Sequence, residues 1–190
     1  LMSELRTRHV NLASDLLEQS PALKENAVAR VNSICDSLEE LVNAVCAVGE
    51  LSDRNKAIII SNGELLSSTI ICFVMNAKGI RTNFIDARKM MITSNEYLKA
   101  EPDVNEISAR VPEIVGEAFK GMDAVITQGF IGSNHSGEQT VLGRGGSDYS
   151  ASLIGMALDA ECIEIWTDVD GVRSADPRTV ENTKYLEKIS

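Results

Sequence analysis

The sequence predicts an α/β protein with three layers, αβα, around a mostly parallel β-sheet, together with an N-terminal helical region. Residues 1–54 carry helix patterns only, whereas residues 55–190 alternate between short β-branched apolar runs and helix patterns. Such alternation implies crossover connections and parallel strands that are covered on both faces. Turns rich in glycine or polar residues follow the apolar runs, and they predict a ligand site along one edge of the sheet.

Length and composition restrict the class of protein. The 190 residues suit one domain, and 44% hydrophobic with 24% charged residues is a globular composition. The net charge of −10 argues against nucleic acid and anionic membranes as partners, because their phosphates would be repelled. Without a secretory signal or an apolar run of transmembrane length, we expect a cytoplasmic protein. The apolar neighbours of Cys35, Cys46 and Cys72 predict buried, reduced thiols.

The helical region is predicted to contain two helices. Leucines at helical spacing indicate the first helix over residues 1–20, just before Pro21. Over residues 24–50, apolar side chains recur at alternating steps of three and four and form a single stripe. We therefore expect the second helix to pack on a neighbouring helix or sheet.

The α/β part begins with a predicted strand over residues 56–61, because an apolar β-branched run is typical of a buried strand. The remaining elements are expected in chain order: a helix over 65–78, a strand over 81–86, a helix over 104–119, a strand over 123–127, a hairpin over 133–142, a helix from Ser147 and a strand over 161–167.

The most distinctive stretch is the glycine loop, residues 143–146, with the sequence Gly-Arg-Gly-Gly. Its glycines allow tight turns and close approach to a ligand. Ser147 and Asp148 occupy the positions of an N-cap and a first turn, where free N–H groups and the helix dipole favour an anion. Arg144 adds a planar donor suited to a carboxylate or phosphate. A glycine-rich turn before an ordinary capped helix explains the loop equally well when it is considered alone.

Three further turns are predicted at the same edge, over residues 61–64, 129–132 and 167–171. Together with the glycine loop they suit a small zwitterion beside a polyphosphate, with Glu64 holding an ammonium group and Arg144 a carboxylate. Structural explanations exist for the acids: Glu64 and Asp148 as first-turn residues, and Asp168 as part of an Asx turn. The sequence contains no P-loop, dinucleotide loop or protein kinase motif, and any metal would arrive with nucleotide phosphates.

Several ordered motifs make the chain similar to a known family. They are Ser61-Asn-Gly-Glu64, the stretch from Phe84 to Lys89, the stretch from Ile126 to Gly132, the stretch from Thr140 to Ser150, and Ile165 to Gly171 with Ala175-Asp-Pro-Arg178. In these motifs the chain resembles the aspartokinases of the amino-acid kinase superfamily. The resemblance is strong over residues 55–190 and general in character before them.

The resemblance implies a carbamate-kinase-like fold and ATP-dependent phosphorylation of the side-chain carboxylate of L-aspartate to 4-phospho-L-aspartate. That reaction opens lysine, methionine and threonine biosynthesis. By motif position, Glu64 would meet the substrate ammonium, Arg144 its α-carboxylate, and Asp148 would order the phosphoryl site as the catalytic residue. Gly145, Gly146 and Ser147 would surround the substrate. The implied nucleotide contacts are Gly129, Gly132, Thr167, Asp168, Arg173 and Arg178, with Mg²⁺ carried by ATP.

The chain also departs from the family pattern. A first strand reading Lys-Phe-Gly-Gly, a later Phe-Gly-Ala-Lys segment and the regulatory ACT modules have no counterpart among these residues. Both segments carry phosphate-binding lysines, and such charge typically lowers a barrier by several kcal/mol, so we expect an inactive fragment. A sheet edge left open by the missing strand predicts a homo-oligomer. Asn62 and Arg173 stand where histidine and tyrosine are common.

Two other interpretations stay open at this point. The chain could be a non-catalytic fragment or subunit that binds an amino acid or a nucleotide and assembles with a partner. It could also be another amino-acid kinase relative, one that phosphorylates a different carboxylate or a carbamate. Glu64 combined with the glycine loop favours aspartate over this last alternative.

Overall fold

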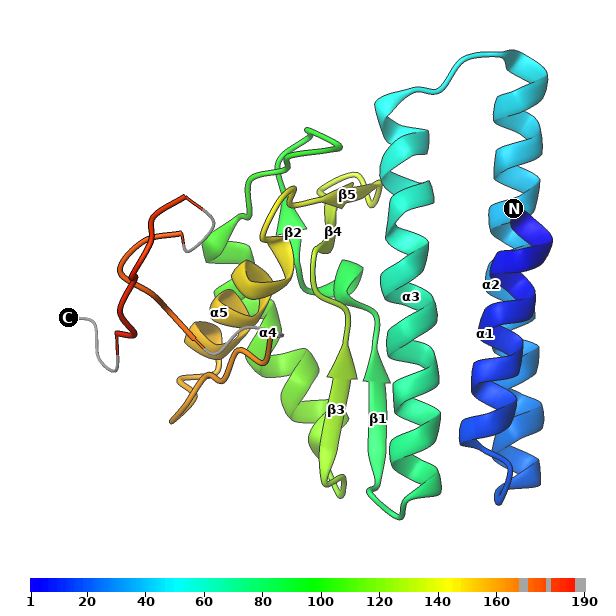
Figure 1. Ribbon diagram of the computed structural model, residues 1–190, viewed down its shortest axis with the longest axis horizontal. Helices are drawn as coiled ribbons and strands as arrows, with labels where there is room; N and C mark the ends of the chain where they lie inside the picture. Colours follow the sequence, from blue (N-terminus) through cyan, green and yellow to red (C-terminus); the bar gives the residue numbers. More distant parts are fainter. Residues whose placement is uncertain (168–170, 177–178, 187–190) are drawn as a thin grey trace.

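A computed structural model describes residues 1–167, 171–176 and 179–186 (Figure 1). The helices are α1 (Met2–Leu16), α2 (Pro21–Val48), α3 (Asp53–Ala77), α4 (Val104–Phe119) and α5 (Gly146–Ala157), with a short 3₁₀ helix, η1 (Ala87–Lys89). The strands are β1 (Thr82–Ile85), β2 (Ile92–Thr93), β3 (Ala124–Thr127), β4 (Ile131–Asn134) and β5 (Gln139–Val141).

Helices α1 and α2 form an antiparallel pair along one side of the molecule (Figure 1). The predicted apolar stripe of α2 faces inward in its first half, where Val31 and Ile34 are buried against Leu66 and Ile70 of α3. Gly49 ends α2 in the left-handed conformation, with φ of 75°, as a C-terminal glycine commonly does. The prediction of two packed N-terminal helices is confirmed.

Helix α3 corrects the prediction for residues 56–61, which are helical and do not form a strand. The helix begins at Asp53, where the Ser52 hydroxyl accepts a hydrogen bond from the Asn55 N–H at 3.2 Å. This N-cap satisfies a backbone donor that the first turn leaves open. Burial of Ala57 and Leu66 on opposite faces of the helix, in two different core clusters, then outweighs the β preference of the intervening isoleucines.

By length and apolar composition α3 could also cross a membrane, which the sequence did not lead us to expect. In the structure α3 packs against α2, β1, β3 and β5. It also carries the buried polar residues Ser61, Asn62 and Ser68. These contacts are those of a core helix in a folded domain, and they account for its apolar composition.

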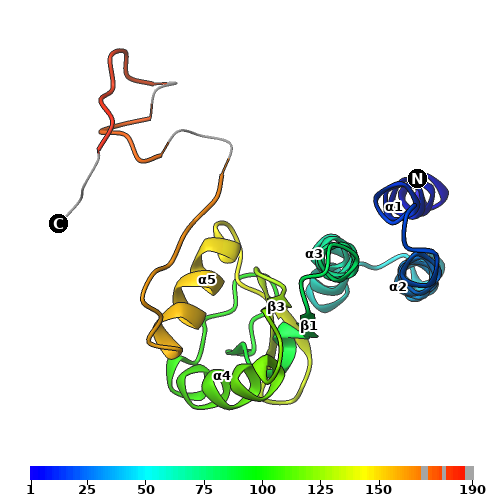
Figure 2. The ribbon, with the colours of Figure 1, turned by 90° about the horizontal axis from the view of Figure 1, so that it is seen from below.

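Strands β1 and β3 form a parallel pair, with Thr82 opposite Ala124 and Ile85 opposite Thr127. Helix α3 covers one face of this pair, α4 covers the other, and α5 packs on α4 (Figure 2). In a second sheet, β2 and β4 are parallel, and β4 and β5 form an antiparallel hairpin. The αβα layers, the hairpin and the helix over residues 104–119 are therefore confirmed.

The chain after α5 differs from its prediction. Residues 161–167 form neither helix nor strand and are exposed, so the expected strand was wrong. Figure 2 shows this segment leading away from the layered body. A β-branched apolar run becomes a strand only where another strand accepts its hydrogen bonds, and within the described ranges no strand pairs with it.

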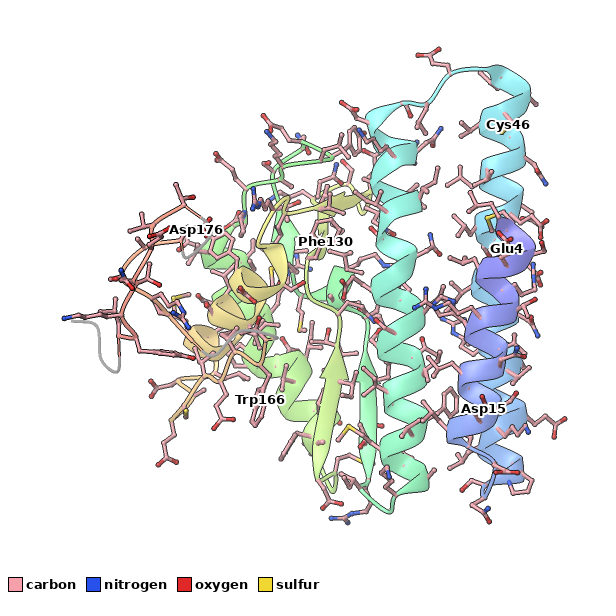
Figure 3. All side chains as sticks on the ribbon, viewed as in Figure 1. Glu4, Asp15, Cys46, Phe130, Trp166 and Asp176 are labelled. Carbon is pink, nitrogen blue, oxygen red and sulfur yellow. The ribbon has the colours of Figure 1, made fainter. Side chains whose placement is uncertain are left out.

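The cysteines differ in burial. Cys35 is buried and Cys72 is half-buried, whereas Cys46 is exposed near the end of α2 (Figure 3). The prediction of burial was therefore wrong for Cys46. The last turns of α2 lie outside the cluster that α2 forms with α1 and α3, as the 75% exposure of Val48 also shows.

Candidate functional site

The candidate site lies where the chain passes from β5 into α5. Gly143 and Gly145 have φ values of 80° and 75°, a region that glycine adopts without the penalty of a Cβ. Gly145 is the N-cap of α5, and Gly146 is its first helical residue. The prediction of Ser147 as the N-cap was wrong, because the N-cap is Gly145 in the left-handed conformation and no side-chain hydroxyl caps the helix.

The first turn of α5 leaves two backbone donors open. The N–H groups of Gly146 and Tyr149 each bind a carbonyl of the glycine loop at 3.1 Å. Between them, the N–H groups of Ser147 and Asp148 have no acceptor in the described part of the chain. Both residues are exposed, so these donors at the positive end of the helix dipole can bind an anion.

Ser150 joins α5 to the turn that follows β3. Its side chain is 1% exposed, accepts a hydrogen bond from the Phe130 N–H at 3.0 Å and donates one to the Gly146 carbonyl at 2.7 Å. Phe130, labelled in Figure 3, has a φ of 68°. Left-handed backbone is costly for an aromatic residue and is concentrated at functional sites, so this turn is held in place by its surroundings.

Gly129 lies directly against the start of α5. A Cβ on Gly129 would lie 2.9 Å from the Ser147 Cα and 3.0 Å from the Ser147 Cβ. Contacts this short are not tolerated between carbon atoms, so only glycine lets the turn after β3 approach the helix. The structure thus brings two predicted site residues, Gly129 and Ser147, into contact.

Gln128 was not predicted as a site residue, although it connects three elements. It is 1% exposed; its Oε1 accepts from the Ala87 N–H at 2.8 Å, and its Nε2 donates to the Ser68 hydroxyl at 3.2 Å. The Ser68 hydroxyl donates in turn to the Glu64 carbonyl at 2.5 Å. An amide directly after the apolar run of β3 was the signal in the sequence, since a buried amide must find partners.

Glu64 lies in the middle of α3, so the prediction that it begins a helix at a strand end was wrong. Residues four apart share one face of a helix, and Glu64 therefore lies on the side of α3 that Ser68 presents to Gln128. The side chain is half-buried, and burial raises the pKa of its carboxyl. A partly desolvated carboxyl in such a position is a candidate for ligand binding.

Arg144 and Asp148 are both exposed, in the glycine loop and the first turn of α5. Contacts through Ser68, Gln128 and Gly129 lead from the helical turn of Glu64 to this loop. Within the described ranges, no hydrogen bond or ion pair joins Glu64 to Arg144. The chemistry of an acid, a guanidinium and free N–H groups suits a ligand with an ammonium and at least one anionic group.

Comparison with known proteins identifies the family. A profile described as the Amino acid kinase family matches residues 7–190. The chain belongs to the amino acid kinase family. Lysine-sensitive aspartokinase 3 of Escherichia coli (strain K12) is 34% identical over 169 residues, which cover 84% of this chain and 36% of that protein. The aspartokinase of Chlamydia trachomatis is 34% identical over 192 residues, which cover 100% of this chain and 40% of that protein.

Solved structures agree with the family and the fold. The chain is similar to E. coli aspartokinase III in complex with aspartate and ADP, with a TM-score of 0.75 and 28% identity, over 94% of this chain and 44% of that one. The same enzyme in complex with lysine and aspartate gives a TM-score of 0.67 and 30% identity. The predicted resemblance to aspartokinases is confirmed, and this chain spans about two fifths of the length of these relatives.

The predicted nucleotide residues of this amino acid kinase family member are less closely grouped. Gly132 lies inside β4, where a Cβ would meet the Met91 carbonyl oxygen at 2.5 Å, so packing explains this glycine. Thr167 is exposed after α5. The Arg173 guanidinium lies 4.8 Å from the centre of the Tyr185 ring and donates to the Thr183 hydroxyl at 3.2 Å. Asp168 and Arg178 lie outside the described residues.

The described residues include no group of three or more His, Cys, Asp or Glu side chains that could hold a metal ion. The anion-binding groups of the site are backbone N–H groups and the Arg144 side chain. These donors fit the oxygens of a nucleotide phosphate. The carboxylate nearest to them in sequence is that of Asp148.

Proposed function

We propose that this chain is the aspartate-binding part of an aspartokinase, which phosphorylates the side-chain carboxylate of L-aspartate with ATP. One observation carries the proposal: the hydrogen bonds of Gln128 and Ser68 join the helical turn of Glu64 to the turn after β3, which contacts the start of α5. These contacts support the proposal that Glu64 and the cationic, N–H-rich loop act on the same ligand. The relatives named as aspartokinases support the choice of substrate.

In this proposal each end of aspartate has its own partner. Glu64 binds the ammonium group, and partial burial strengthens that attraction relative to water. Arg144 binds the α-carboxylate, for which its planar guanidinium offers two parallel donors. Gly145, Gly146 and Ser147 surround the substrate, where the absence of side chains on the two glycines allows close approach.

The chemistry requires positioning and charge neutralisation more than a covalent group from the protein. A side-chain carboxylate oxygen of aspartate forms a bond to the γ-phosphorus of ATP, and the bond from that phosphorus to the β–γ bridging oxygen breaks to release ADP. The open N–H groups of Ser147 and Asp148 are suited to the negative oxygens around this phosphorus. Magnesium, carried by the nucleotide, neutralises phosphate charge when it is bound.

For the nucleotide we propose Gly129, Gly132, Thr167, Asp168, Arg173 and Arg178. Gly129 has the strongest support, because it touches the N-terminal turn of α5. We also propose that the chain works in the cytoplasm and as a homo-oligomer.

Calorimetric titration with three ligands tests the site without requiring turnover. Succinate lacks the ammonium group of aspartate, and β-alanine lacks the α-carboxylate. We expect the wild-type protein to prefer aspartate to both. Glu64→Gln should lose the preference over succinate, and Arg144→Gln the preference over β-alanine, each by about tenfold, the loss of one charge-assisted interaction.

Arg8→Gln, on the exposed face of α1, is the matched control for loss of one arginine and should retain both preferences. Equal aspartate affinity in the wild-type protein and in both site variants would show that the proposed orientation is wrong.

A further inference from the structure

A polar cavity lies between α3 and α2. It has a volume of about 210 Å³ and is enclosed by α2, α3, η1 and β5. Asn62 of α3 lines this cavity. Asn62 and Glu64 are two positions apart in the helix, which places their side chains roughly 200° apart around its axis. The cavity therefore opens on the face of α3 opposite Glu64. At about 30 Å³ for each water, it has room for roughly seven waters or one small ion with part of its hydration shell.

Hydrogen-bond donors dominate the polar lining. Helix α2 contributes Arg30, Ser33 and Ser37, spaced so that all three lie on one face, and η1 contributes Arg88. The Arg30 side chain is exposed and makes no hydrogen bond or ion pair with the residues that the structure describes. An unpaired guanidinium beside the Ser33 hydroxyl is suited to a negatively charged acceptor.

Arg88 is already balanced. Its Nη2 and Nε bind the Asp86 carboxylate at 2.5 and 2.8 Å, and its Nη1 donates to Gln139 Oε1 at 2.7 Å. Asp86 is thus the acid that faces Arg88, and the pair carries no net charge. Arg88 serves to fix the orientation of the Gln139 amide, with its oxygen toward the guanidinium.

Gln139 is the observation that points to a ligand. The side chain is 8% exposed and lines the cavity, and its Nε2 has no hydrogen-bond partner in the described part of the chain. Because Arg88 occupies the amide oxygen, the amide cannot flip to satisfy its nitrogen. A buried amide donor without an acceptor is rare in folded proteins and calls for a group that the protein itself does not supply.

We infer that this cavity binds a small oxyanion, a phosphate or a carboxylate, between Arg30 and Gln139. The ligand accepts from Gln139 Nε2 at its buried end and from the Arg30 guanidinium at its exposed end. Ser33 supplies a further donor along α2, whereas the Ser37 hydroxyl already donates to the Ser33 carbonyl at 3.1 Å. The site is distinct from the proposed aspartate site, since none of the residues proposed to bind aspartate lines this cavity, and it does not depend on the proposed function.

The test is a titration of the protein that carries this chain with inorganic phosphate and, separately, with succinate at constant ionic strength. The side-chain amide signals of Gln139 in ¹H–¹⁵N spectra report binding at the buried end. We expect a saturable shift of these signals, and the more effective anion identifies the source. Arg30→Gln should weaken binding about tenfold, the loss of one charge-assisted hydrogen bond.

Two variants serve as controls. Arg8→Gln removes an exposed arginine from α1 and should bind the anion as the wild-type protein does. Arg144→Gln disturbs the glycine loop and should also leave the Gln139 shift intact. Gln139→Glu keeps the acceptor for Arg88 but replaces the free donor with negative charge. Because it also removes the reporting amide, its anion binding is measured by calorimetry and should be abolished.

Three results would overturn the inference. The first is an equal affinity in the Arg30→Gln and Arg8→Gln variants. The second is loss of binding in Arg144→Gln, which would place the anion at the glycine loop. The third is no saturable shift of the Gln139 amide in the wild-type protein, which would assign its free donor to water. Arg30 is exposed, so its variant keeps the test valid even where Gln139→Glu fails to fold.

Discussion

Strand β3 and residues 161–167 have similar patterns of residues but different structures. Both are short β-branched apolar runs followed by polar or glycine residues. β3 pairs with β1 along its length and lies between α3 and α4. In residues 161–167, Ile163 and Ile165 are 44% and 46% exposed, and Trp166 is 89% exposed. The intrinsic preference is the same, and only the first run has a neighbouring strand.

This difference in pairing explains why the proposed substrate residues and the proposed nucleotide residues are not held in place equally firmly. The turn after β3 is positioned by a paired strand. Its residues Gln128, Gly129 and Phe130 contact Ser68, Ser147 and Ser150, respectively. Thr167 follows a segment without such pairing. The proposed substrate residues of the glycine loop and α5 are therefore held by packing within this chain, whereas the proposed nucleotide residue Thr167 ends a segment that no described strand pairs with.

The largest change in unfolding free energy is expected for Gly129→Ala, in comparison with a second Gly→Ala substitution. In Gly129→Ala the new Cβ meets the Ser147 Cα at 2.9 Å, and backbone cannot move aside cheaply. We expect a loss of unfolding free energy at the upper end of about 1–3 kcal/mol, as for overpacked cores. Thermal and chemical unfolding measure the change.

Gly155→Ala is the matched control on the second region. Its Cβ meets Ile163 side-chain atoms at 2.4 and 2.5 Å, yet Ile163 belongs to the unpaired segment and can shift. Alanine also favours a helix interior by about 1 kcal/mol over glycine, so the net change should stay within about 0.5 kcal/mol. Equal costs for the two substitutions would mean that residues 161–167 are held as firmly as β3.

The second effect concerns the two faces of α5. Ser150→Ala removes the acceptor of the Phe130 N–H and should cost about 1–2 kcal/mol of unfolding free energy. Ser152→Ala removes only an exposed hydrogen bond to the Asp148 carbonyl and should change it by less than about 0.5 kcal/mol. Urea unfolding curves of both variants give the values, and a Ser150→Ala variant as stable as Ser152→Ala would argue against a fixed turn.

The same contrast shows what could be predicted from the sequence. Helical periodicity and glycine positions were sufficient for α1, α2, α4 and the β4–β5 hairpin, since these signals are local. Residues 56–61 and 161–167 were both predicted as strands and neither is one. For the first, the Ser52 N-cap and helical burial override β preference. For the second, the missing partner is a tertiary feature that a local pattern cannot contain.

For the proposed site, glycine and turn patterns predicted the glycine loop, Gly129 and Glu64 as candidates, and motif resemblance gave each a role. It did not locate Gln128 or Ser68, because a polar residue at the end of a strand does not reveal which side chain will bind it. The unpaired Gln139 nitrogen was also beyond prediction, since it depends on Arg88 occupying the other end of the amide.

The third effect is on the pH dependence of stability. Burial raises the pKa of Glu64 above its ordinary value, so the folded state holds this proton more tightly than the unfolded state. Stability therefore declines as pH rises from the ordinary glutamate pKa through the raised one. Glu64→Gln should remove this decline and melt at a higher temperature above that window, while it loses aspartate preference.

Melting temperatures of the wild-type protein and Glu64→Gln across acidic to neutral pH, taken as a difference, isolate this group from the others. Glu40→Gln, an exposed position on α2, is the control for loss of one negative charge. A constant difference between the wild-type and Glu64→Gln melting temperatures at every pH would refute the assignment to Glu64.

The smallest effect is expected at Trp166, and it reports on the second region directly. It is the single tryptophan of the chain, so fluorescence comes from residues 161–167 without interference. At 89% exposure its emission should resemble that of tryptophan in water and be fully accessible to iodide, and Trp166→Phe should change the unfolding free energy by less than about 0.5 kcal/mol. Blue-shifted emission protected from iodide would instead mean that a strand or another surface covers residues 161–167. The contrast with β3 would then disappear, and with it the reason for treating the proposed nucleotide residues as the less firmly held.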